Sequence, residues 1–169
     1  MRAWGPSAWL LRAAVLLTPL GALALAAPSG PPPAWVWSGT LLLALWWAAM
    51  PEGPGGVLCL LGVAGWWARV EPGLPATVLP AAALLLAAHL AALVVGYGPG
   101  GLRPSREVLV LWGCRGAVLA VLAVPVWALG SALAAAGDPP VWVWPAAGLA
   151  VAGAGLLAAY VAVGERIEG

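Results

Sequence analysis

The sequence alternates between long apolar runs and short turns rich in proline and glycine. The apolar runs have the composition expected of membrane-spanning helices. Soluble domains carry about 25% charged residues, whereas this chain of 169 residues is 63% hydrophobic and 8% charged. Because so few charges cannot cover a surface that faces water, we expect lipid tails to solvate most of the chain. The expected spans are residues 9–27, 35–50, 55–70, 76–95, 111–136 and 144–163.

The predicted fold is therefore all-α, a polytopic integral membrane protein of about six transmembrane helices. Residues 1–169 form one transmembrane domain, and we expect no soluble domain. The second and third spans are short, since the apolar run at 35–50 gives a helix of only about 24 Å. Either both cross the bilayer, with Arg69 reaching the far interface, or they form a helical hairpin that enters and leaves one face. Both alternatives return the chain to the same side.

The first span resembles a secretory signal peptide. Arg2 and Arg12 precede an apolar centre at residues 13–27, and small residues follow at Ala24 and Ala26. Because the rest of the chain is equally apolar, we interpret this segment as a first transmembrane helix that is not cleaved.

The longest polar connection is at residues 96–106. Near its end, Ser105 is the expected N-cap of a helix with Glu107 in its first turn. We expect this helix to lie partly at the membrane interface before it crosses at residues 113–136. Pro125 should kink it.

The arginines predict the orientation of the spans. Six crossings would place both termini on one face, together with all the arginines except Arg69. Cytoplasmic loops are enriched in Lys and Arg, so we expect the N- and C-termini to be cytoplasmic. The chain has no Lys, Asn, Gln or Phe and is rich in residues with GC-rich codons. This usage favours a bacterial cell (cytoplasmic) membrane as its location.

Tryptophan is abundant, and most of the indoles fall at the ends of apolar runs. The headgroup region favours indole rings. We therefore expect interfacial anchoring for all of them except Trp127, which lies inside the fifth span. The tryptophans are Trp4, Trp9, Trp35, Trp37, Trp46, Trp47, Trp66, Trp67, Trp112, Trp127, Trp142 and Trp144.

Two segments of the chain resemble each other. PPAWVW at 32–37 matches PPVWVW at 139–144, and RAAVL at 12–16 matches RGAVL at 115–119. One interpretation is a parallel internal repeat that relates spans one and two to spans five and six, as in some transporters. The other is that a biased residue alphabet and the demand for interfacial Trp produce the match without common ancestry.

Residues 96–101 satisfy the pattern G-x-G-x-x-G. A dinucleotide site needs this pattern between a strand and a helix, with free backbone N–H groups for the pyrophosphate. Here an apolar span precedes the pattern, and Pro99 removes one N–H group. We interpret the segment as a cytoplasmic loop.

The two cysteines, Cys59 and Cys114, lie in apolar runs without C-x-x-C spacing. The expected topology places both near the cytoplasmic side, where structural disulfides are rare. We expect buried, unreactive thiols.

His89 is the sole ionisable side chain deep inside an expected span. An ionisable group at that depth is a functional hypothesis by default. A proton relay needs a partner, however, and the positions one helical turn away hold Leu85, Leu86, Ala92 and Leu93. Another helix would have to supply the partner, with Cys59 and Thr18 as weak candidates. The alternative is a neutral histidine that bonds a carbonyl or hydroxyl group.

No set of convergent polar groups predicts an enzyme. The acidic residues fall in turns, and the net charge of +1 offers no basic surface for nucleic acid. We expect no catalytic, cofactor or metal site. The expected function is an accessory or structural subunit of a membrane complex, and the alternative is a small transporter or channel-like component. The expected partners of the chain are the lipid bilayer and either other membrane subunits or a second copy of the chain.

Overall fold

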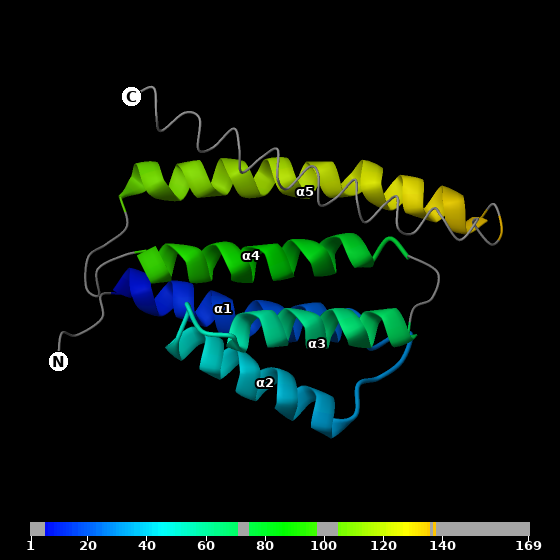
Figure 1. The fold of residues 1–169 in the computed structure, drawn as a ribbon, viewed down its shortest axis with the longest axis horizontal. Coiled ribbons are helices and arrows are strands. Elements are labelled where there is room, and N and C mark those ends of the chain that lie inside the picture. The colour runs from blue at the N-terminus through cyan, green and yellow to red at the C-terminus, as the bar shows by residue number, and fades with distance from the viewer. Residues whose placement is uncertain (1–5, 71–74, 98–104, 136, 138–169) are drawn as a thin grey trace. The chain divides into compact units, whose positions relative to one another are not determined.

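The computed structural model describes residues 6–70, 75–97, 105–135 and 137 of the chain (Figure 1). Within these ranges the regular structure is helical, without strands, which confirms the predicted all-α class for the described part. The expected sixth span, the second WVW segment and Arg103 lie outside the described residues. The helices are α1 (Pro6–Ala24), α2 (Ala34–Ala49), α3 (Gly55–Val70), α4 (Val78–Tyr97) and α5 (Arg106–Ala135).

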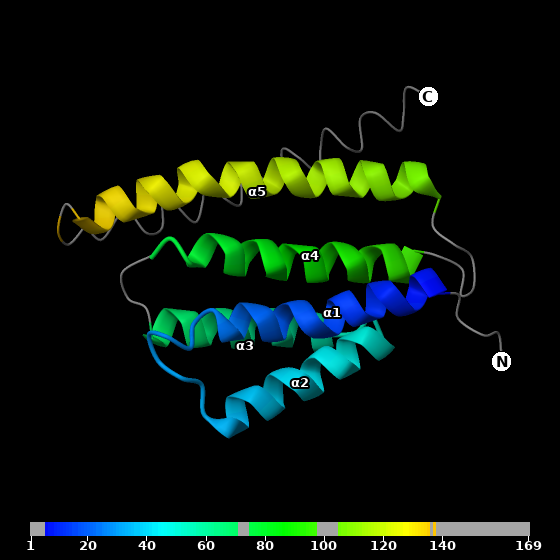
Figure 2. The same cartoon turned by 180° about the vertical axis from the view of Figure 1, so that it is seen from behind.

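Helix α1 organises the first four helices, because it packs against α2, α3 and α4. The largest of these contacts is with α4, while α2 and α3 form an antiparallel pair on another side of α1 (Figures 1 and 2). Small side chains dominate the two core clusters. One cluster includes Val15, Ala44 and Ala88, and the other includes Ala22 and Ala81. Small residues allow helix backbones to approach closely, which favours association in lipid.

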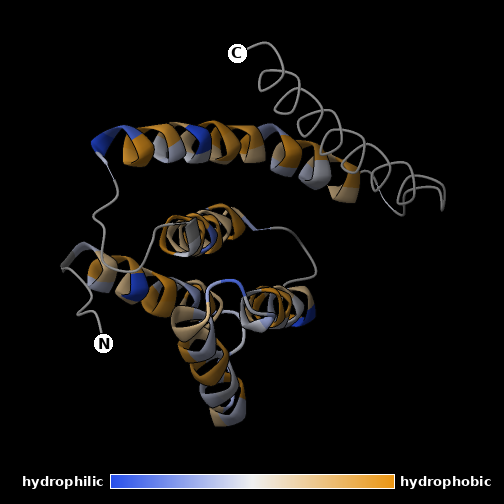
Figure 3. Cartoon of the chain, turned by 60° about the vertical axis from the view of Figure 1, so that its left-hand side comes forward, coloured by the Kyte–Doolittle hydropathy of each residue, from blue (hydrophilic) through white to orange (hydrophobic). Residues whose placement is uncertain are grey.

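Three of the five helices are long and apolar enough to cross a membrane. These are residues Ser7–Ala24, Val78–Gly96 and Arg106–Ala135, whereas α2 and α3 are equally apolar but shorter. Apolar residues, in orange, recur along the described helices in Figure 3. Leu10 is 72% exposed and Val121 is 69% exposed. A helix that is apolar around its circumference suits lipid rather than water.

Ser105 caps α5, as the sequence predicts. Its side-chain oxygen accepts a hydrogen bond from the backbone N–H of Val108 at 3.3 Å, and its carbonyl accepts one from Leu109 at 3.1 Å. From this cap α5 continues through Pro125 to Ala135. At about 1.5 Å per residue this helix is about 45 Å long.

Two helix C-termini receive donors from a neighbouring helix. The guanidinium of Arg12 in α1 donates to the carbonyl of Ala48, in the last turn of α2. The indole N–H of Trp67 in α3 donates to the carbonyl of Ala22 at 3.0 Å, near the end of α1. Carbonyls in the last turn of a helix have no partner within that helix. These two side chains therefore satisfy groups that would be costly to bury unbonded.

The expectation that every tryptophan except Trp127 anchors at the lipid interface is wrong for Trp47 and Trp67. Their side chains are 2% and 8% exposed. Trp47 fits inside because Gly56, which follows the turn into α3, presents no side chain: a Cβ atom there would lie 2.5 Å from the indole ring. Both tryptophans lie at helix ends but belong to the core of the bundle.

Gly56 should therefore tolerate no side chain. We expect Gly56→Ala to lower the free energy of unfolding by about 1–3 kcal/mol, because the new methyl group overpacks against Trp47. Thermal unfolding in mild detergent measures the effect. Gly62→Ala on the same helix is the control, since no described atom lies within 4 Å of its Cβ position. Replacing Gly there should be neutral or stabilise α3 by up to about 1 kcal/mol. Equal unfolding temperatures for the two variants would contradict this packing.

Trp67→Phe should destabilise the fold through its hydrogen bond. An aromatic ring remains, although it is smaller than indole, and the buried carbonyl of Ala22 loses its donor, at a cost of about 1–3 kcal/mol. Trp66→Phe is the matched control, because the buried indole nitrogen of Trp66 has no acceptor among the described residues. The same unfolding measurement should show a clearly smaller loss for Trp66→Phe. A loss as large as that of Trp67→Phe would mean that ring volume, and not the hydrogen bond, sets the effect.

Candidate functional site

His89 lies on the outer surface of α4. Its side chain is exposed, whereas the neighbouring Ala88 is fully buried. Along the helix, His89 is about 16 Å from Val78 and about 12 Å from Tyr97. If α4 crosses a bilayer, the imidazole is thus near the middle of the hydrocarbon.

The two weak candidates for a partner bond elsewhere. Thr18 donates to the carbonyl of Ala14 within α1, at 2.8 Å. Cys59 is buried, and its sulfur lies 4.0 Å from the carbonyl of Thr40. In the part of the chain that the structure describes, His89 has neither a hydrogen-bond partner nor an ionic partner. Sequence reasoning identified the residue but could not tell that it faces outward.

The surface around His89 is apolar. One helical turn away on the same face of α4 lie Leu85, Leu86 and Leu93, which are half-buried, and two turns away lies the exposed Ala82. Next to Ala82 the surface is hollowed: a cavity of about 310 Å³ lies between α3 and α4. Its lining consists of Ala64, Trp67, Ala68, Val78, Ala81, Ala82 and Leu85. Another apolar helix could approach α4 closely here.

Helix α5 is exposed along its length, and Gly116 is its one buried residue. A Cβ atom at Gly116 would lie 2.5 Å from the Leu90 side chain of α4. The expectation of a buried thiol is wrong for Cys114, which is exposed, because α5 contributes so little to the interior. Arg115 is also exposed, and its guanidinium lies 5.4 Å from the ring centre of Trp112.

The described residues do not assemble a metal centre: they contain no group of three His, Cys, Asp or Glu side chains that could hold an ion. Glu52, in the turn between α2 and α3, lies beside Gly96 at the end of α4 and lines a cavity of about 270 Å³. The other residues of that cavity are Pro51, Ala92, Leu93 and Gly96, which carry no ionisable side chain.

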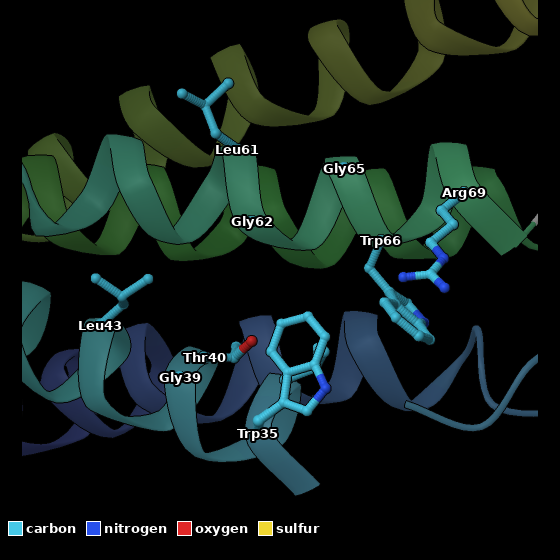
Figure 4. Close-up of a pocket in the computed structure, with 10 residues that line it drawn as sticks. Trp35, Gly39, Thr40, Leu43, Leu61, Gly62, Gly65, Trp66 and Arg69 are labelled. Carbon is cyan, nitrogen blue, oxygen red and sulfur yellow. The ribbon is translucent and has the colours of Figure 1, made fainter. Parts of the chain in front are cut away.

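A third hollow, which we call the α2–α3 groove, runs between α2 and α3 (Figure 4). It encloses about 360 Å³ and is lined by Trp35, Val36, Gly39, Thr40, Leu43, Leu61, Gly62, Gly65, Trp66 and Arg69. Gly39, Gly62 and Gly65 leave it open, since no described atom lies within 4 Å of their Cβ positions. Sequence reasoning did not identify these glycines or the groove.

One end of the α2–α3 groove is polar. The guanidinium of Arg69 lies 5.5 Å from the ring centre of Trp66. Trp66 in turn meets Trp35 edge to face, with ring centres 6.5 Å apart and an angle of 86° between the rings. A cation and two indoles therefore converge where α3 ends and α2 begins (Figure 4).

Comparison with known proteins gives no relative: no protein-family model matches the chain, and no match is found among curated proteins or solved structures.

Proposed function

We propose that this chain is an accessory subunit of a larger membrane assembly, with no catalytic activity of its own. The single observation that carries the proposal is His89, an exposed imidazole in the middle of an apolar helix without a partner among the described residues. The proposed partner is another membrane protein whose helix packs on the face of α4 that bears His89.

The physical argument rests on hydrogen bonding in hydrocarbon. An imidazole has one N–H donor and one acceptor nitrogen when neutral, and lipid tails can satisfy neither. Ionisable side chains inside membrane spans almost always face protein or a water-filled cavity for this reason. A hydroxyl, amide or carbonyl group on a partner helix would satisfy the imidazole. The exposed Ala82, two helical turns away on the same face of α4, permits the close approach that such a bond needs.

The exposed length of α5 supports the same proposal. Most of its apolar side chains face away from the described residues, among them Val121, Val126 and Leu129. Its Arg115 and Cys114 are exposed as well. A subunit held by a partner along α4 and α5 would cover these groups, whereas lipid tails would leave the His89 imidazole without a polar neighbour.

The proposed setting is a bacterial cytoplasmic membrane, with six spans and both termini in the cytoplasm. The arginine distribution supports this orientation. Within the described helices, Arg12 contacts the last turn of α2, while Arg69 lies beside Trp35 at its first turn. The two charges thus occupy opposite ends of α2, as the proposed topology requires.

A pull-down with His89 variants tests the partner. The tagged full-length chain, purified from its native membranes in mild detergent, should bring down one membrane protein at a fixed ratio. His89→Leu should weaken this association roughly five- to thirtyfold, since interhelical hydrogen bonds contribute about 1–2 kcal/mol. His89→Gln keeps a donor and an acceptor and should retain the partner. Ser38→Ala is the matched control, because Ser38 on α2 bonds only its own helix, at the carbonyl of Trp35.

Other outcomes would contradict the proposal. A photo-crosslinker at Ala82, on the same face of α4 as His89, should attach to the partner protein. Exclusive crosslinks to a second copy, or to residues 138–169 of the same chain, would show that no other subunit covers this face. A growth phenotype that depends on one solute and is lost in His89→Ala would instead indicate the small transporter.

Reporter fusions test the orientation. Alkaline phosphatase, which is active only outside the cytoplasm, should remain silent when it is fused after Gly101. The same reporter after Pro72 should be active, because that turn follows Arg69 on the opposite face. Activity after Gly101 would overturn the proposed topology.

A further inference from the structure

We propose that the α2–α3 groove binds one phospholipid, with the phosphate on Arg69 and one acyl chain along the wall formed by Gly39, Gly62 and Gly65. This inference is independent of the proposed partner, which contacts α4 and α5. It depends on a different part of the molecule and on its own observations.

The shape of the groove fits a single hydrocarbon chain. Its volume of about 360 Å³ lies at the lower end of the range for small-molecule sites, roughly 300–1,000 Å³. From Leu61 to Arg69 it follows about two turns of α3, or roughly 12 Å. The exposed Leu61, Gly62 and Gly65 line it on the outer side of α3, so a lipid could enter sideways from the bilayer.

The walls leave space that the described chain does not fill. Three glycines face the groove, and their missing side chains open it along both helices. Side chains that border an empty gap lose dispersion contacts on that side. A flexible acyl chain from the surrounding lipid restores these contacts without placing a polar group against Val36 and Leu43.

The end of the groove selects a phosphate. Arg69 is the one charged residue in the lining, and it is exposed. A guanidinium pairs with phosphate oxygens through two parallel hydrogen bonds. Trp66, whose ring lies under the guanidinium, positions it at the end of the apolar groove, and Trp35 contacts Trp66 there. Indole rings favour the same headgroup layer in which lipid phosphates lie. Charge complementarity therefore favours an anionic phospholipid over a lipid without phosphate.

Native mass spectrometry of the full-length chain tests the groove. After lipid removal in mild detergent, the chain should bind one dioleoyl phosphatidylglycerol. Gly62→Leu fills the groove and should reduce the bound fraction about fivefold or more, because the side chain occupies the space of the acyl chain. Gly65→Leu fills the same groove from the next turn of α3. It replaces Gly62→Leu in this test if Gly62→Leu does not fold. Gly113→Leu on α5 is the matched control, since its Cβ position is equally open but lies outside the groove; it should bind like the natural chain.

Two further ligands distinguish the contribution of the phosphate to binding from that of the acyl chains. Dioleoylglycerol lacks the phosphate and should bind about fivefold or more weakly than phosphatidylglycerol. In Arg69→Gln the two lipids should bind about equally. Glycerol 3-phosphate lacks the chains and should not displace the lipid at equal concentration.

Three results would overturn the proposal: full binding in both leucine variants of the groove, an unchanged lipid preference in Arg69→Gln, or displacement by glycerol 3-phosphate. The last result would indicate a simple anion site on Arg69 rather than a lipid groove.

Discussion

Hydrogen bonding without water is the constraint on which this fold depends. A backbone carbonyl that faces lipid tails must find its donor inside the protein, and the last turn of a helix cannot supply one. Arg12 and Trp67 supply donors across helix boundaries, to Ala48 and Ala22. Each bond joins α1 to one helix of the α2–α3 pair. The polar requirement of the backbone is therefore met where α1 packs against α2 and α3, although almost every side chain between these helices is apolar.

The sequence predicted what depends on local chemistry. The apolar runs and proline turns predicted the helical class and the places where helices break. Ser105 was identifiable as an N-cap because the cap involves only the next few residues. Helix α3, at Gly55–Val70, has the bounds of the expected span, whereas α1 ends at Ala24, three residues before the expected end at residue 27.

The rest depends on contacts between residues far apart in the chain. Arg12 looked like the basic start of a signal peptide, because nothing local shows that the end of α2 lies beside it. Trp67 looked like an interfacial anchor, since a position at a helix end does not reveal which way the ring points. Cys114 was expected to be buried because its neighbours in the sequence are apolar. Apolar neighbours indicate burial only where their helix packs into a core, and α5 does not. His89 was identified from the sequence as an ionisable residue within an apolar span. Only the structure shows that its side chain is exposed.

The length of α5 has a mechanical consequence. Its roughly 45 Å exceed a hydrocarbon core of about 30 Å by some 15 Å. The charged residues Arg106, Glu107 and Arg115 lie in its first ten positions, which matches this excess. If the rest of α5, after Arg115, crosses the bilayer, a shift of the helix toward its C-terminal end would bury Arg115 among the lipid tails. A shift in the other direction would expose leucines and valines to water. The polar start and apolar remainder of α5 would thus fix the depth of this helix in the bilayer.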